Sequence, residues 1–210
     1  MSKGILARKV GMTQVFDEHG RSFPVTVLKA GPCYVVQVKA AEQDGYNSVQ
    51  LGFEPQAEQR VNQPLKGHYR QANIAPCRYL REFRVDDPQE YTLGQQLNCD
   101  IFSPGDYVDV RAITKGKGFA GSIKRHGFSR GPESHGSHYH RGPGSLGAVD
   151  QARVFKGRPL PGRMGRQKRV VQNLQVAQVD SSKHLLLVKG SIPGPRGALV
   201  EVRTAAKAGR

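Results

Sequence analysis

Residues 115–169 read KGKGFAGSIKRHGFSRGPESHGSHYHRGPGSLGAVDQARVFKGRPLPGRMGRQKR, and this stretch decides how the rest of the chain must be built. It holds 13 of the 32 Lys and Arg residues and 12 of the 25 glycines, but only two acids, Glu133 and Asp150. It therefore carries +11 of the formal net charge of +15. So little of it is apolar that burial cannot offset the entropy lost on ordering. We call it the basic segment and expect an irregular arm that becomes ordered along a phosphate backbone.

The sequence on either side of the basic segment has the patterns of β-strands. Some stretches alternate apolar and polar residues, as half-buried strands do, and others are rich in β-branched residues and Leu. Turn signals separate them, among them residues 17–20 and Pro104-Gly105. The expected strands are residues 34–38, 48–53, 79–85 and 107–113 before the basic segment, and 170–179, 185–188 and 198–202 after it.

Many short strands with frequent turns predict a mainly β protein, with a small antiparallel barrel or sandwich as its body. Strands from both sides of the basic segment are expected to share one sheet, so the body combines residues 1–114 and 170–204. Residues 56–75 lack alternation and predict a short helical insertion with a breaker at Pro64. The basic segment is then a long, largely irregular extension, because structureless loops of this length are rare inside a compact domain. We expect a flexible C-terminal tail over residues 205–210.

Cysteine usage and hydropathy point to a cytoplasmic protein. Cys33, Cys77 and Cys99 are widely spaced and odd in number, which predicts free buried thiols in a reducing cytosol. We find no apolar window of ~18 residues that would indicate a membrane span, and no signal peptide. A pI near 10.1 favours nucleic acid over a membrane as partner, since the glycines of the basic segment forbid an amphipathic basic helix.

Two glycine patterns in the basic segment resemble enzyme motifs. Gly116, Gly118 and Gly121 spell the dinucleotide-binding pattern, but the run that should form its helix stops at Gly127 and the required acid is missing. Glycines set between lysines fit a close approach of backbone to RNA phosphates better. Ser129 lies in a GxSxG pattern without the apolar strand and the helix of a nucleophile elbow. We therefore expect no cofactor, no small-molecule substrate and no catalytic residue.

Histidines and aromatic residues also recur in the basic segment. The histidines at 135, 138 and 140 would need further ligands to hold zinc, and every cysteine is at least 36 residues away. Stacking on bases or donation to phosphates is the favoured interpretation, and a solvated polar loop is the alternative. The aromatic residues could stack on unpaired bases or pack locally. They are Phe119, Phe128, Tyr139 and Phe155.

Several motifs resemble the bacterial ribosomal protein L3 family of the large subunit. They occur in the family's order, and the resemblance runs from the N-terminus to about Thr204. They are GMT at 11–13, KGKGFAG at 115–121, SHG at 134–136, RGPGSLG at 141–147, RVFKG at 153–157, PGRMG at 161–165, VQNL at 171–174 and LLLVKG at 185–190.

The resemblance implies a body related to the translation-factor barrels, with a small helical insertion. It implies binding to large-subunit, 23S-type rRNA near its 3′ end, an early role in subunit assembly, and contacts with neighbouring ribosomal proteins. It also implies that the basic segment threads through rRNA, with its tip close to the peptidyl transferase centre.

The expected site residues lie in two groups. The rRNA-binding group comprises Lys115, Lys117, Lys124, Arg125, Arg130, His135, His138, His140, Arg141, Arg153, Lys156, Arg158, Arg163, Arg166, Lys168 and Arg169. The group near the peptidyl transferase centre, which we call the tip, comprises Gly144, Ser145, Leu146, Gly147, Ala148, Val149, Asp150 and Gln151.

The tip departs from the family in one respect. Some family members carry Gly-Gln-x-Gln-Thr-Pro-Gly there, with the second Gln methylated on N5. This chain reads GAVDQAR over residues 147–153, one residue shorter and without Thr-Pro-Gly. Gln151 is the remaining candidate for methylation, and the altered motif predicts that it is unmodified.

Residues and resemblance together favour a non-catalytic structural component of the large ribosomal subunit. A free RNA-binding assembly factor is the first alternative, and co-sedimentation with mature ribosomes would distinguish the two. A hydrolase using Ser129 would require esterase activity that a Ser129→Ala variant loses. A DNA-compacting protein would prefer duplex DNA to rRNA fragments.

Overall fold

The computed structural model describes residues 3–207. The chain forms two compact units. The first, which we call the body, is Met1–Ile113 together with Lys168–Arg210, and the second unit is Thr114–Gln167. The second unit coincides with the basic segment to within two residues at either end.

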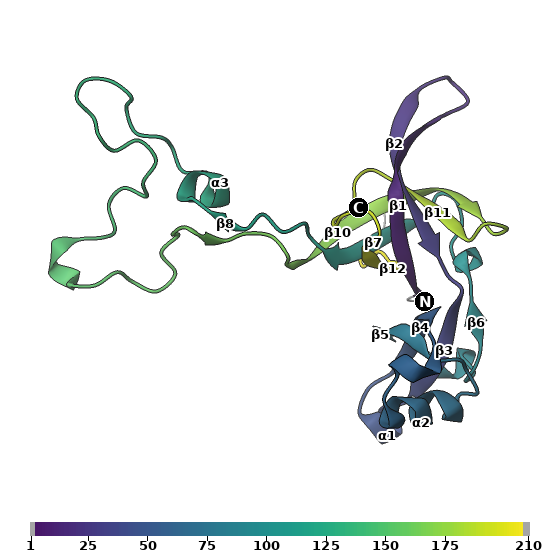
Figure 1. Cartoon of the computed structure of the whole chain (residues 1–210). Coiled ribbons are helices and arrows are strands. Elements are labelled where there is room, and N and C mark those ends of the chain that lie inside the picture. Colours follow the sequence, from purple (N-terminus) through teal and green to yellow (C-terminus); the bar gives the residue numbers. More distant parts are fainter. Residues whose placement is uncertain (1–2, 208–210) are drawn as a thin grey trace. The chain divides into compact units, whose positions relative to one another are not determined.

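Six antiparallel strands of the body form a closed ring (Figure 1). The ring brings together strands from both sides of the basic segment, as the sequence predicts: Val110 lies opposite both Val202 and Val171. In ring order the strands are β1 (Gly4–Phe16), β12 (Leu199–Thr204), β7 (Tyr107–Ile113), β10 (Lys168–Asp180), β11 (Leu185–Lys189) and β2 (Ser22–Ala30).

The alternation within these strands places apolar side chains inside the body. In β7, Val108 and Val110 are fully buried, whereas Arg111 and Ile113 are exposed. Full burial of an aliphatic side chain of this size stabilises the fold by about 1.5–3 kcal/mol. The main core cluster draws all its described members from the body, so the body holds its core without help from the second unit.

A second antiparallel sheet belongs to the same unit. Its strands, in sheet order, are β5 (Cys77–Arg84), β4 (Ser48–Pro55), β3 (Cys33–Lys39) and β6 (Gln96–Leu97). The six-stranded ring packs tightly on this second sheet at Gly4, where a Cβ would come within 2.3 Å of the aromatic side chain of Phe83. The expected single barrel or sandwich is therefore a ring with a four-stranded sheet against it.

Short helices accompany the second sheet. They are α1 (Ala41–Asp44), α2 (Gln63–Gln71) and the 3-10 turns η1 (Glu58–Arg60), η2 (Pro88–Glu90) and η3 (Cys99–Ile101). Residues 56–75, where helices were expected, hold η1 and α2. The prediction that Pro64 breaks a helix was wrong, because Pro64 lies in the first turn of α2, where its missing N–H has no helical acceptor to lose. The Asn62 side chain caps this turn by accepting from the Leu65 N–H at 3.2 Å.

Two features of the body differ from the sequence predictions. Strands β1 and β2 were not predicted, although the turn between them was. At the other end of the chain, the expected tail begins with residues that the body holds: Ala205 is buried and donates its N–H to the Tyr107 carbonyl at 3.0 Å. Ala206 donates to the Asp109 carboxylate at 3.4 Å. Residues 208–210 of the predicted tail lie outside the described residues.

The second unit has little regular structure. Strands β8 (Phe119–Ala120) and β9 (Gly162–Arg163) pair antiparallel, and further backbone bonds join residues 114–118 to residues 164–167. We call this two-stranded part the stem. Beyond it the unit holds the helix α3 (Ser122–His126) and the 3-10 turn η4 (Val149–Gln151), joined by loops (Figure 1).

All three cysteines are free and buried, as predicted. Burial raises the pKa of the Cys33 thiol to about 12 and that of Cys77 to about 11. In the part of the chain that the structure describes, no helix combines the length and apolar character needed to cross a membrane.

Candidate nucleic-acid interface

The stem presents cations from both of its chains. Lys115 and Lys117 on the outgoing chain are exposed, as are Arg163 and Arg166 on the returning one. The chains approach closely at Gly165, where a Cβ would lie 2.2 Å from the Lys115 carbonyl oxygen and where φ is +76°. Only glycine fits this position, so the close spacing of these cations depends on it.

Helix α3 carries one exposed and one tethered cation. Lys124 is exposed, whereas the half-buried Arg125 donates from its guanidinium to the Leu160 carbonyl at 2.8 Å. The ring of His126 lies 3.0 Å from the same carbonyl oxygen. Gly127 ends the helix in the left-handed conformation. Arg125 is among the residues expected to bind RNA, and its guanidinium also ties α3 to the returning chain.

The histidine-rich loop follows α3. Arg130 pairs with Glu133 at 2.9 Å, and both side chains are well exposed. His140 Nδ1 lies 2.8 Å from the Pro132 carbonyl oxygen, while His135 and His138 are exposed to solvent. Among the described residues, no group of His, Cys, Asp or Glu has the arrangement of a metal site. The loop presents the exposed imidazole rings of His135 and His138 to solvent.

The tip is uncharged apart from Asp150 and exposes apolar groups. Val149, at the start of η4, is 94% exposed. The loop before it is fixed by Arg158, whose guanidinium donates to the Ser145 carbonyl. An apolar side chain held out in water on a constrained turn is suited to packing against another macromolecule.

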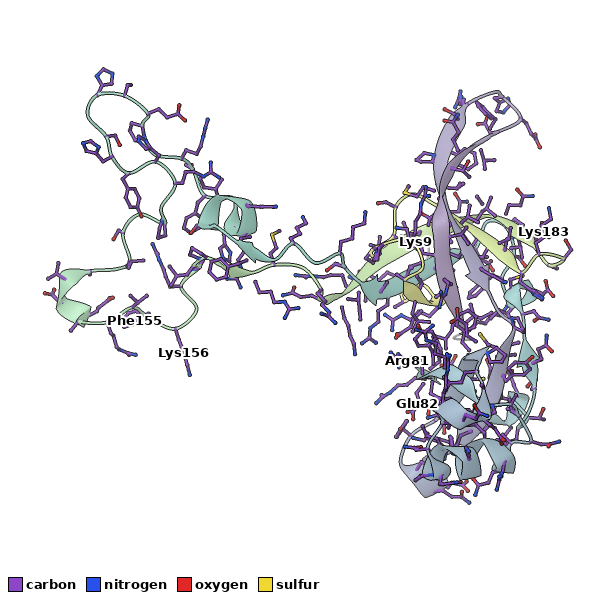
Figure 2. All side chains as sticks on the ribbon, in the orientation of Figure 1. Lys9, Arg81, Glu82, Phe155, Lys156 and Lys183 are labelled. Carbon is purple, nitrogen blue, oxygen red and sulfur yellow. The ribbon has the colours of Figure 1, made fainter. Side chains whose placement is uncertain are left out.

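The returning chain leaves the tip with alternating cations and apolar residues. The Arg153 guanidinium lies 5.1 Å from the centroid of the Phe155 ring, a cation–π contact. Phe155 and Lys156 project from this loop (Figure 2). Arg153, Lys156 and Arg158 are all exposed, so the cations expected here are accessible to a ligand.

The last two expected cations belong to the body. Lys168 and Arg169 begin β10, where they pair with Ile113 and Ala112 of β7. Both side chains are exposed at the start of this strand.

Ion pairing differs between the two units. In the body, several cations pair with acids: Arg8 with Glu54 at 2.5 Å, and Arg81 and Arg111 both with Glu201, at 3.2 and 3.5 Å. In the described second unit, the one ion pair is that between Arg130 and Glu133. The charge of the second unit is therefore left for an external anion.

The enzyme-like patterns lack the extended helix that the corresponding motifs require. Gly116 and Gly118 precede the two-residue β8, and α3 is only five residues long, far from the extended helix of a dinucleotide fold. Ser129 lies exposed in a loop with Gly131 after it rather than a helix.

The structure also assigns roles that the sequence did not. Gly131 and Gly142 lie against Tyr139: a Cβ on either would come within 2.0 Å of an atom of that residue. In the sequence, the only sign of these contacts is that Gly131 and Gly142 lie on either side of Tyr139. These two glycines and Gly165 admit the chain's own backbone and side chains, whereas the expected approach to RNA phosphates concerns Gly116, Gly118 and Gly121 and stays a prediction.

Comparison with known proteins identifies the family. The family model for ribosomal protein L3 matches residues 82–185. The chain is 59% identical to the large ribosomal subunit protein uL3 of Carboxydothermus hydrogenoformans, over 99% of both chains. It is 57% identical to uL3 of Pelotomaculum thermopropionicum, again over 99% of both chains, and 56% identical to that of a Geobacillus species with the same coverage. The chain belongs to the ribosomal protein L3 family, as its motifs predicted.

Proposed function

We propose that this chain is a structural constituent of the large ribosomal subunit that binds 23S-type rRNA through its second unit. Its relatives are named as large-subunit proteins. The observation that carries the proposal for this chain is the set of exposed cations on the second unit, with one ion pair among its described residues. A partner with regularly spaced negative charges supplies the counter-charges that these cations do not find within the chain.

The mechanism is electrostatic and geometric. Cations such as Lys117 and Lys156 neutralise phosphates that would otherwise repel where rRNA helices converge. The narrow, glycine-containing stem lets the chain pass between RNA segments as an irregular extension. The tip lies near the peptidyl transferase centre and positions nucleotides there by packing, without chemistry of its own, and Gln151 remains unmodified.

The body has a separate role in this proposal. The ring is a small barrel of the translation-factor kind, and it provides a rigid base from which the second unit reaches RNA. Binding near the 3′ end of the rRNA early in assembly nucleates folding of the subunit, and neighbouring ribosomal proteins pack on the body. The protein acts in the cytoplasm, as part of the ribosome.

Co-sedimentation tests the proposal. A tagged chain expressed in cells should sediment with mature large subunits at one copy per subunit and remain bound after washing at moderate salt. Recovery only with immature precursor particles would support the assembly-factor alternative. Recovery with nucleoid DNA would support the DNA-compacting alternative, and either result would overturn the proposal.

A further inference from the structure

Tyr139 is held in place by the loop that contains it. Its hydroxyl accepts a hydrogen bond from the Gly144 N–H at 2.8 Å. Gly142 lies against the ring, and a Cβ there would come within 2.0 Å of it. Gly131 packs on the Tyr139 carbonyl and donates its N–H to the His140 carbonyl at 2.9 Å. Three glycines thus fix the position of one aromatic side chain.

Tyr139 is nevertheless 52% exposed. The Tyr139 hydroxyl accepts the Gly144 N–H and keeps its own proton to donate. Beside the hydroxyl, the residue presents the flat apolar surface of its ring.

The other aromatic residues of the second unit differ from Tyr139. Arg153 stacks over the Phe155 ring at 5.1 Å from its centroid, and the rings of Phe128 and His126 lie 5.9 Å apart, centroid to centroid. Phe119 is 80% exposed on the stem. In the part of the chain that the structure describes, neither a ring nor a cation stacks on Tyr139. It is the aromatic residue that is both fixed and open.

We propose that Tyr139, with its glycine supports, forms a preformed stacking site for one unpaired nucleobase. A fixed ring loses little entropy on binding, and every base has a π-face that can stack on it. Exposed Arg141 and His138 flank Tyr139 in sequence; Arg141 supplies positive charge and His138 a ring nitrogen for the phosphate beside that base. The inference rests on the proposed function, and it adds that this loop takes a single-stranded or flipped-out base rather than a duplex.

Two probes separate stacking from phosphate binding. The full chain is titrated with a short single-stranded RNA of mixed sequence, and with an abasic ribose-phosphate strand of the same length. Tyr139→Leu removes the ring and leaves the charge unchanged. It should weaken binding of the base-containing strand by about 5- to 150-fold, the range found for loss of one stacked base. Binding of the abasic strand should not change.

A pair of glycine variants serves as a second test that keeps Tyr139 intact. Gly142→Ala forces a Cβ against the ring and should weaken binding of the base-containing strand as Tyr139→Leu does. Gly67→Ala, in α2 of the body, is the matched control, because nothing lies within 4 Å of the Cβ it adds and its φ is not positive.

The outcomes also distinguish this inference from the proposed function. Equal losses with both probes would show that Tyr139 holds phosphate contacts, and unchanged binding of both would show that it does not touch RNA. Either result overturns the stacking site while leaving rRNA binding in place. If the wild-type chain binds neither probe nor large-subunit rRNA, the proposed function itself fails.

Discussion

Lys9 shows how a single buried charge holds parts of the body together. It lies in β1, is 8% exposed, and donates from Nζ to the carbonyls of Ile192 at 2.8 Å and Gly194 at 3.1 Å. In the sequence Lys9 is one cation among 32. Its burial could not be predicted, because its acceptors lie 183 and 185 residues away.

Replacing Lys9 by Met should destabilise the body. The variant keeps the apolar stem but leaves two buried carbonyls without their charged donor, which costs about 1–3 kcal/mol in the free energy of unfolding. Urea unfolding followed by circular dichroism measures it. Lys29→Met, at an exposed position of β2, is the control and should change stability little. Equal stability of the two variants would show that the Lys9 contacts contribute nothing net.

The buried thiols give a second prediction at this scale. Because burial raises the pKa of Cys33 to about 12, its reactive thiolate is scarce at pH 7 and below. Cys33 should therefore react with Ellman's reagent only when the body unfolds, and all three cysteines should react at once in concentrated urea. Fast labelling of Cys33 in the native protein would contradict the burial.

Among the elements, the sequence predicted those strands whose residues follow a local pattern. The alternation over 107–113 and the β-branched run over 170–179 correspond to β7 and β10. Strand β1 was missed because its apolar residues do not alternate regularly. Its register shifts between Lys9 and Gly11, where a bulge inserts a residue. The second sheet was also missed, since sheet membership depends on contacts between distant strands.

The sequence locates the cations of the second unit but not the contacts that they make within the chain. Lys117 and Lys156 are exposed as expected, whereas Arg125 is tied to Leu160. Sequence position alone does not show which cation meets a carbonyl of its own chain, because that contact joins residues 35 apart.

The exposed lysines of the second unit should set the salt dependence of rRNA binding. Replacing Lys117, Lys124 and Lys156 together by Ala should flatten the slope of log affinity against log salt by about two to three units. A filter-binding series over salt concentration measures the slope. The matched control replaces exposed lysines of the body: Lys29, Lys183 and Lys207. A larger change in the control than in the first variant would place the main electrostatic contact on the body.

The tip should affect the ribosome's catalytic centre without affecting assembly. Asp150→Tyr adds bulk at an exposed position of η4. Ribosomes containing full amounts of the variant should show altered puromycin reactivity and altered sensitivity to drugs that bind this centre. Glu133→Tyr makes the same change at the other acid of the basic segment and should leave both properties unchanged. Wild-type behaviour of the Asp150 variant would mean that the tip is a passive end.

In the whole molecule, the body supplies the folded core, and the second unit supplies the cations proposed to bind RNA. The core clusters draw their described members from the body, and the second unit is held by its stem and by local contacts. This division was predictable from composition, because charge and glycine are concentrated in one stretch while the strand patterns lie outside it.

The body should fold without the second unit. Residues 115–166 can be replaced by a short Gly/Ser linker, because Thr114 and Gln167 already share a backbone hydrogen bond of 2.9 Å. The truncated chain should unfold cooperatively on heating, since its buried apolar residues are retained. A gradual loss of signal without a transition would show that the second unit supplies part of the core.

We propose that this chain contacts rRNA mainly through its second unit. Ultraviolet crosslinking of purified large subunits, followed by mass spectrometry of the crosslinked peptides, tests it most directly. We predict that crosslinked residues are concentrated between 114 and 167, on both chains of the stem and in the histidine-rich loop. Crosslinks confined to the body, with the second unit unmodified, would contradict the account.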